Sequence, residues 1–258
     1  RMIRPTAIVH ENAEIHPGAE IGPYTIIDGH VTLGADCVVG PHVHLTGHTT
    51  IGSGNRFHTG CVIGDAPQDV KYDGEPTRLI IGDGNTFREH VTIHRSNTLE
   101  EDTRIGSENM FMANSHVGHN AIVGNRAILA NGALVGGHAM IGDGAFLSGN
   151  AVVHQFCRVG SMAMMQGCSG VSLDLPPFTI VRGINGMCGL NSVGLKRAGF
   201  SSEERLELKQ TYRALFMGSD LMKDAIAKAR ERFTGVLAEQ FLDFIDSSER
   251  GTCSHTKR

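Results

Sequence analysis

Apolar residues recur at every sixth position along the first two thirds of the chain. Between Ile3 and Val171 this spacing gives 29 positions, of which only Asp69 and Glu75 are not apolar. A chain with 40% hydrophobic residues would place roughly 12 apolar residues at such positions by chance. A period of six fits neither an α-helix nor a plain strand. We therefore expect short strands alternating with turns, and we reject a coincidence of ordinary alternating strands.

A second register supports this interpretation. Small residues lie four positions after most of the apolar ones, and glycine often follows the apolar residue directly. A large aliphatic side chain can fill the interior of a coil, a small one fits a tight corner, and glycine adopts turn dihedral angles that strain other residues. The combination predicts a parallel β-helix of stacked repeats. The small residues include Ala121, Ala127, Ala133, Ala139, Ala145, Ala151, Cys157 and Ala163.

This pattern resembles the hexapeptide-repeat transferases over about residues 3–176. The resemblance implies an all-β, left-handed parallel β-helix with about 18 residues per coil, hence about nine to ten coils stacked about 4.8 Å apart. Residues 64–80 and 96–104 interrupt the pattern, yet the apolar positions restart in phase after each. We expect both segments to be excursions from the coil, where functional residues tend to concentrate.

Helical spacing replaces the six-residue pattern in the last third of the chain. Ser201 and Glu204 form a capping box that begins a helix, Ser219 or Asp220 is expected to cap a second, and a third is expected at about 235–247. We predict a β-helix domain at 1–178 and a small α-helical C-terminal domain at 179–258. From residue 196 onward the chain has 12 Lys or Arg and 10 Asp or Glu, against 11 and 17 before it. The helical domain is thus either a cap on the β-helix or a docking face for an acidic partner.

Charge and cysteine content narrow the class of protein. A net charge of −4 and a pI near 6.4 argue against a general binder of nucleic acid or anionic membranes. We find no long apolar run that would span a bilayer and no apolar core of a signal peptide. Six scattered cysteines without a CxxC pair favour reduced thiols and a cytoplasmic protein.

Histidines gather at one expected edge of the β-helix. Equivalent positions of successive coils should stack, so Gly137 and Gln155 lie over His119 and are flanked by His138 and His154. Such a cluster could bind a metal, as in β-helix carbonic anhydrases, but their H-x4-H spacing is absent. The nearest spacings here are His116-x2-His119 and His90-x3-His94. The other option is a general base, because neutral imidazole titrates near working pH and can accept a proton from a hydroxyl.

A closer resemblance comes from a series of motifs across nearly the whole chain. They are GDAPQDVKYDGEPTRL, VTIHR, HVGHN, GGHAMIGDGAF, AVVHQFCRVG, GCSGVSLDLPPF and GLKRAGF. Together they resemble the UDP-N-acetylglucosamine acyltransferases of lipid A synthesis. The resemblance implies transfer of a 3-hydroxyacyl group from acyl carrier protein to the glucosamine 3-OH, without a cofactor. It also implies a cytoplasmic homotrimer with its sites between subunits.

The same resemblance implies roles for individual residues. His119 matches the general base, and the Gly137 N–H matches the donor to the oxyanion. Asn120 stands where the family often has Asp, so the group that orients His119 is open; Val193 and Ala198 also depart from the family. The implied substrate-binding residues are Asp69, Lys71, His116, His138, His154 and Gln155, with Asn191 and Arg197 at the nucleotide.

The acyl chain and the exact reaction are less determined. The end of the acyl groove is expected near Met162, Met164, Gln166 and Gly167. Glycine would leave space there, whereas Gln or the adaptable methionines could close the groove. Three alternative functions stay open: N-acyl transfer to a UDP-amino-sugar, a metal-dependent hydratase, and a non-catalytic paralogue.

Overall fold

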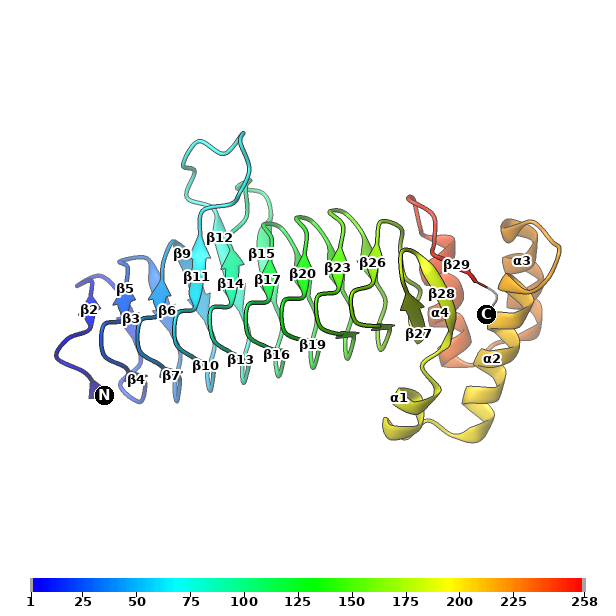
Figure 1. Ribbon diagram of the computed structural model, residues 1–258, viewed down its shortest axis with the longest axis horizontal. Helices are drawn as coiled ribbons and strands as arrows, with labels where there is room; N and C mark the ends of the chain where they lie inside the picture. Colours follow the sequence, from blue (N-terminus) through cyan, green and yellow to red (C-terminus); the bar gives the residue numbers. More distant parts are fainter. Residues whose placement is uncertain (1, 257–258) are drawn as a thin grey trace.

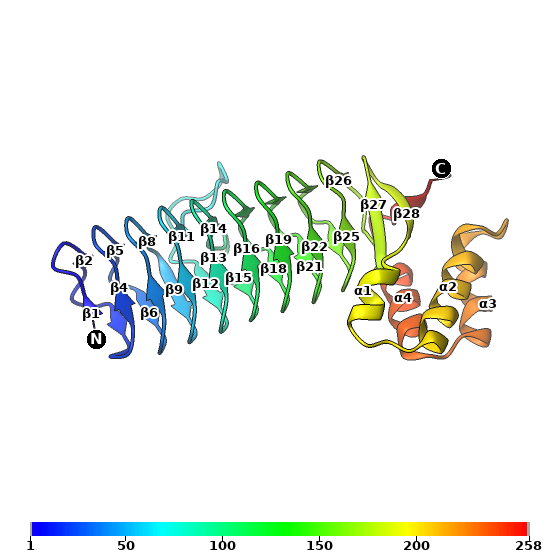
Figure 2. The same cartoon turned by 60° about the horizontal axis from the view of Figure 1, so that its bottom comes forward.

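The computed structural model describes residues 2–256, which form a long three-sided prism with helices at its C-terminal end (Figures 1 and 2). Each side of the prism is a sheet of short strands, and neighbouring strands along the prism are parallel up to β27. The first sheet contains β1 (Met2–Ile3), β4 (Glu20–Ile21), β7 (Val38–Val39), β10 (Arg56–Phe57), β13 (Thr86–Phe87), β16 (Met110–Phe111), β19 (Ile128–Leu129), β22 (Phe146–Leu147), β25 (Met164–Met165), β27 (Thr179–Arg182), β28 (Gly186–Leu190) and β29 (Ser254–His255).

The second sheet contains β2 (Ile8–Val9), β5 (Ile26–Ile27), β8 (His44–Leu45), β11 (Val62–Asp65), β14 (Thr92–His94), β17 (His116–Val117), β20 (Leu134–Val135), β23 (Val152–Val153) and β26 (Gly170–Val171). The third contains β3 (Glu14–Ile15), β6 (Val31–Leu33), β9 (His48–Ile51), β12 (Arg78–Ile81), β15 (Asp102–Ile105), β18 (Ile122–Val123), β21 (Met140–Ile141) and β24 (Arg158–Val159).

Strand pairing shows the length of each coil. Val117 pairs with Val135, three hexads further along the chain, as the repeat predicts. Ile63 pairs with Ile93 across the first interruption, and Ile93 pairs with Val117 across the second. The first interruption thus lengthens its coil by two whole hexads and the second by one. Both excursions therefore leave the register of the coils unchanged.

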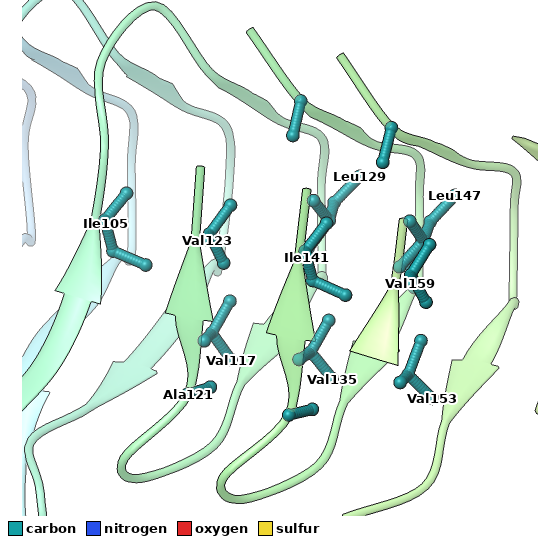
Figure 3. Packing of buried hydrophobic residues seen from close by; sticks show 14 of the residues in the cluster. Ile105, Val117, Ala121, Val123, Leu129, Val135, Ile141, Leu147, Val153 and Val159 are labelled. Atoms are coloured by element: carbon teal, nitrogen blue, oxygen red, sulfur yellow. The ribbon is translucent and has the colours of Figure 1, made fainter. Parts of the chain in front are cut away.

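The every-sixth apolar residues fill the interior of the prism. Figure 3 shows Val117, Val135 and Val153 pointing inward from successive coils of one sheet, and all three are buried. Burial of such side chains contributes about 1.5–3 kcal/mol each. The small residues of the second register are also fully buried at the corners. Ile3 and Ile15 are only partly buried, because the first coil has no neighbour on its outer side.

Two ladders of like side chains run through the interior. The Phe ladder occupies positions of the six-residue pattern, whereas the Asn ladder was not expected from it. Phe57, Phe87 and Phe111 stack with ring centroids 4.8 and 4.9 Å apart. At a neighbouring corner Asn55, Asn85 and Asn109 form a buried ladder in which each amide bonds to the next. These polar side chains are stable inside because their hydrogen bonds are satisfied by one another and by turn carbonyls.

The excursions are shorter than the sequence pattern suggested. β11 continues to Asp65 and β12 begins at Arg78, so the first loop covers 66–77 and projects from the prism (Figure 1). The second loop covers 95–101, between β14 and β15. Arg95 joins the loops, because its guanidinium donates to the Tyr72 hydroxyl at 2.8 Å and to the Gly64 carbonyl at 2.9 Å. Both loops start from the edge between the second and third sheets.

The C-terminal region begins with a hairpin instead of a helix. β27 and β28 pair antiparallel and extend the first sheet past residue 178, so the division at 178 stays a prediction. The helices follow as α1 (Ser192–Arg197), α2 (Ser202–Phe216), α3 (Met222–Arg232) and α4 (Val236–Asp246). None of the helices within residues 2–256 is long and apolar enough to cross a membrane.

Two predicted helix starts had different outcomes. The capping box of Ser201 and Glu204 is confirmed at the start of α2. The predicted cap by Ser219 or Asp220 is wrong, because the N-cap of α3 is Leu221 and makes no side-chain hydrogen bond. Asp220 instead accepts a hydrogen bond from Lys228 at 2.8 Å.

Candidate active site

His119 lies on a turn that joins β17 of the second sheet to β18 of the third. The turns one and two coils further on, which carry Gly137 and Gln155, stack beside it. In these turns Asn120, His138 and Phe156 have φ values of 58°, 58° and 63°. This left-handed backbone recurs once per coil at this edge and turns the chain from the second sheet onto the third around the buried Ala121 and its equivalents. The predicted stacking of these turns at one edge is therefore what the structure shows.

The hydrogen bonds of Asn120 define the tautomer of the neutral His119 ring. Asn120 is 5% exposed, and its Oδ1 lies 3.0 Å from His119 Nδ1. The Asn97 backbone N–H also donates to this oxygen at 2.9 Å, which identifies the atom as the acceptor end of the amide. His119 Nδ1 must then carry the proton. The lone pair of the neutral ring is consequently on Nε2.

Gly137 stands next to that nitrogen. A Cβ atom at Gly137 would lie 2.8 Å from His119 Nε2, so only glycine leaves room for the ring and a substrate. Within residues 2–256 the Gly137 N–H donates no hydrogen bond, whereas the N–H groups of Gly136 and His138 on either side donate to the carbonyls of Val153 and His119. A base and an unpaired N–H donor thus lie side by side, the arrangement that acyl transfer requires.

We expect Gly137→Ala to lower kcat/KM roughly 10-fold or more, because its methyl group displaces the His119 ring from its working position. Gly149→Ala is the matched control. Its Cβ would meet only the Asn131 carbonyl, at 3.5 Å, and we expect a change within about twofold. Steady-state kinetics of the two variants would decide; equal rates would show that the space beside His119 is not needed.

Two further histidines lie near this base, one in the next turn and one on β17 of its own coil. The His138 ring lies edge-on to His119 with centroids 5.2 Å apart and stacks on Phe156 at 4.6 Å. Burial and the nearby His119 lower the pKa of His138. His116 Nδ1 lies 2.7 Å from the Thr92 hydroxyl, and burial lowers its pKa to about 4. Both are therefore neutral at neutral pH and suited to hydrogen bonding with an uncharged substrate.

His94 is a site residue that the sequence pointed to only through its His90-x3-His94 spacing, as part of the metal alternative. It is 7% exposed, and its ring lies 4.8 Å from that of His116. Its Nδ1 is buried without a hydrogen-bond partner in the described chain. The second excursion lengthens this coil from three hexads to four, so His94 is the equivalent of Gly118, the residue before His119. Counting four hexads back from Gly118 would therefore have placed His94 at the site.

Asp69 reaches the site from the first loop. Its carboxylate accepts from the Lys71 backbone N–H at 3.0 Å and from Asn97 Nδ2 at 2.6 Å. These two donors hold the pKa of Asp69 below its usual value. Asp69 is thereby joined through Asn97 to Asn120 and His119. The Lys71 side chain is exposed on the same loop, free to contact a ligand.

His154 and Gln155 are exposed at the C-terminal side of the same edge. The His154 ring nitrogen Nδ1 lies 3.0 Å from the Gln155 carbonyl oxygen. The structure therefore places these two residues in the predicted column, at its solvent-accessible end.

The other predicted residues lie on different parts of the prism. Met162, Met164, Asn191 and Arg197 line an apolar groove at the first sheet and its edge with the third sheet, and Asn191 Nδ2 donates to the Met162 carbonyl at 3.0 Å. Gln166 and Gly167 lie at the remaining edge, in the turn between β25 and β26, and do not line this groove. One chain therefore does not bring the histidine edge and the groove together.

A metal centre is not suggested by the donor geometry of one chain. Across residues 2–256 no three His, Cys, Asp or Glu side chains are arranged to hold a metal ion. His116 and His119 were one of the pairs considered as metal ligands. Their Nδ1 atoms instead have hydrogen-bond partners in the Thr92 hydroxyl and the Asn120 side chain.

Comparisons with known proteins agree with this fold. Residues 102–137 match a family model described as bacterial transferase hexapeptide (six repeats). Residues 174–253 match the model for domain 2 of UDP-N-acetylglucosamine O-acyltransferase. The chain belongs to the family of acyl-[acyl-carrier-protein]–UDP-N-acetylglucosamine O-acyltransferases.

Individual relatives cover nearly the whole chain. The acyltransferase of Halorhodospira halophila is 41% identical over 96% of this chain and 98% of its own length. That of a Janthinobacterium species is 44% identical over 97% and 98%. Among solved structures, the Francisella novicida UDP-N-acetylglucosamine acyltransferase has a TM-score of 0.94 at 36% identity, covering 99% of this chain and 95% of that one. These matches confirm the predicted left-handed β-helix with C-terminal helices.

Proposed function

We propose that this chain transfers a 3-hydroxyacyl group from the thioester of acyl carrier protein to the glucosamine 3-OH of UDP-N-acetylglucosamine, the first step of lipid A synthesis. The observation that carries the proposal is the free Nε2 of His119 beside the unpaired Gly137 N–H. The names of the relatives support the donor and the acceptor.

The reaction follows from these two groups. His119 Nε2 takes the proton of the sugar 3-OH while its oxygen attacks the thioester carbonyl carbon. The Gly137 N–H stabilises the negative charge that forms on the carbonyl oxygen. The C–S bond then breaks, and the proton held by His119 passes to the departing thiolate. No cofactor is required, because the thioester supplies the activated acyl group.

The remaining residues are assigned as substrate contacts. Asp69, Lys71, His116, His138, His154 and Gln155 surround the reacting sugar on the histidine edge. Asn191 and Arg197 bind the nucleotide, since a guanidinium pairs well with phosphate. Met162 and Met164, together with Gln166 and Gly167, border the acyl chain.

A homotrimer explains why these groups lie on separate faces of one chain. The histidine edge of one prism can meet the groove of Met162, Asn191 and Arg197 on its neighbour, so that each site forms between two subunits. The unpaired cysteines of residues 2–256 support a reducing compartment, and we place the enzyme in the cytoplasm.

Mass spectrometry of the products tests this proposal. The purified protein is incubated with UDP-N-acetylglucosamine, or in parallel with its 3-amino analogue, and a panel of 3-hydroxyacyl carrier proteins. We expect one acyl chain per sugar in an alkali-labile ester, with one chain length preferred. An alkali-stable amide on a UDP-amino-sugar would replace the proposal with N-acyl transfer. No product with any donor would contradict it.

A further inference from the structure

The group that contacts His119 Nδ1 is an uncharged amide, whereas a general base gains from a carboxylate at this place. Asn120 Oδ1 lies 3.0 Å from His119 Nδ1. On its other side, Asn120 Nδ2 donates to Glu101 Oε2 at 2.9 Å. A carboxylate is therefore present one residue further out, and a buried amide connects it to the base.

We propose that Glu101 is a positioning residue for the reaction, which acts through Asn120 to orient His119 and to stabilise its protonated form. This inference rests on the proposed function, because it requires His119 to accept a proton. Asn120 connects Glu101 to His119, and Glu101 supplies the negative charge that Asn120 lacks.

The two ends of the Asn120 amide show why Glu101 matters for orientation. Its oxygen end faces two donors, the Asn97 N–H and the His119 Nδ1–H, and its nitrogen end faces a carboxylate, which only accepts. A flipped amide would set NH2 against the Asn97 N–H and oxygen against Glu101. Glu101 thus helps to fix the amide that fixes the His119 tautomer.

The backbone beside Glu101 is held firmly. Asp102 is nearly buried, and Arg78 donates to its carboxylate at 2.6 Å. Thr103 Oγ1 accepts the Asn120 backbone N–H at 2.7 Å. These contacts anchor the start of β15 against the turn of His119. The Glu101 side chain is 60% exposed, but its Oε2 also lies 3.5 Å from His138 Nδ1, so the carboxylate has a partner on each side.

The charges around His119 favour a proton on its ring during the reaction. Burial lowers the pKa of each of the three neighbouring histidines, so they do not add positive charge at neutral pH. Two carboxylates lie near the site. Asp69 is connected to it through the Asn97 amide, and Glu101 through the Asn120 amide and the His138 ring. The titratable groups that surround His119 are His94, His116, His138, Asp69 and Glu101.

The first test compares Glu101→Gln with Glu100→Gln. Glutamine keeps an acceptor for Asn120 but loses the charge. We expect Glu101→Gln to lower kcat about 10-fold, which is the lower end of the effects seen when a residue acts through another residue. The effect is at this lower end because solvent screens part of the charge of Glu101. Loss of the carboxylate removes a negative charge that stabilises the protonated form of the base, so the acid limb of the pH profile of kcat/KM moves to lower pH. Glu100 makes no side-chain hydrogen bond in the described chain, and its variant is expected to match the wild type.

The second test moves the carboxylate inward. Asn120→Asp combined with Glu101→Gln places a carboxylate directly at His119 Nδ1, with glutamine as its donor. We expect this double variant to recover most of the lost rate and to move the acid limb back to higher pH. Asn120→Asp alone sets two carboxylates against each other and should be slower than the double variant.

Two results would overturn the inference: a Glu101→Gln profile identical to that of Glu100→Gln, or a slower Glu101→Gln whose acid limb is unmoved and which Asn120→Asp does not rescue. His119→Ala is assayed in the same series. If His119→Ala is inactive while Glu101→Gln is normal, only the role of Glu101 fails. If His119→Ala is fully active, the proposed mechanism itself fails.

Discussion

His119→Ala is expected to lower kcat at least about 10²-fold, which is the usual contribution of a positioned general base. The ring nitrogen that would accept the hydroxyl proton is Nε2, because Nδ1 is bonded to Asn120. Alanine removes this nitrogen and leaves the Gly137 N–H in place, so the loss should fall on kcat and leave KM nearly unchanged. The acid limb of the pH profile should vanish with it.

The matched control for this variant is His10→Ala. His10 lies after β2, on the same edge of the prism and five strands of the second sheet before His119. Its ring packs beside Gly29 of the next coil, and it accepts a hydrogen bond from the Asn12 N–H of its own turn. We expect wild-type kinetics for it. Far-ultraviolet circular dichroism and sedimentation of both variants verify folding and assembly. A folded, assembled His119→Ala with near-normal kcat would contradict the assignment of the base.

The arrangement of the histidine edge could be predicted from the sequence because a β-helix has a fixed coil length. Once each coil is known to hold three hexads, the positions of His119, Gly137 and Gln155 follow by counting, and the strand register confirms it. The inward and outward directions follow from the same count. No other contact information is needed for this part of the site.

The partners of Asn120 could not be found in this way. Asn97 and Glu101 belong to a loop outside the repeat, so counting does not place them, and their contacts depend on how the loop folds back. The separation of the acyl-groove residues has a related cause. Met162 and Gly167 are close in sequence, but a strand lies between them and carries them to different edges of the prism.

The hairpin of β27 and β28 was missed for a different reason. Residues 183, 186 and 189 are all glycine, and this composition hides the alternation that marks a strand. Its position also depends on distant contacts, because β28 pairs with β29 at the C-terminal end of the chain. Long-range pairing of this kind connects the helical region to the prism.

Asp174 is central to that connection. It is 2% exposed, and its carboxylate accepts from the Arg158 backbone N–H at 2.8 Å, from Arg158 Nε at 2.9 Å and from the Ser248 hydroxyl at 2.8 Å. Arg158 in turn donates to the Phe244 carbonyl in the last turn of α4. This turn contains no basic residue of its own, so Arg158 supplies the positive charge that stabilises a helix C-terminus.

We expect Asp174→Ala to lower the free energy of opening of the C-terminal helices by about 3 kcal/mol, because it leaves a partly buried guanidinium without its carboxylate. That corresponds to a roughly 10²-fold faster amide hydrogen exchange in α4. Exchange in the strands β4 to β19 should not change, since their hydrogen bonds run along the prism and do not involve Asp174. Hydrogen exchange with mass spectrometry at fixed protein concentration measures both regions in one experiment.

Asp243→Ala provides the matched comparison. Asp243 lies on α4 and pairs with Arg230 at 2.7 Å, but its side chain is 67% exposed. An exposed pair contributes about 1 kcal/mol or less, so exchange in α4 should rise only slightly. If both variants changed exchange equally, the burial of Asp174 would have no special effect. The helices would then be held to the prism by their apolar contacts and the pairing of β28 with β29.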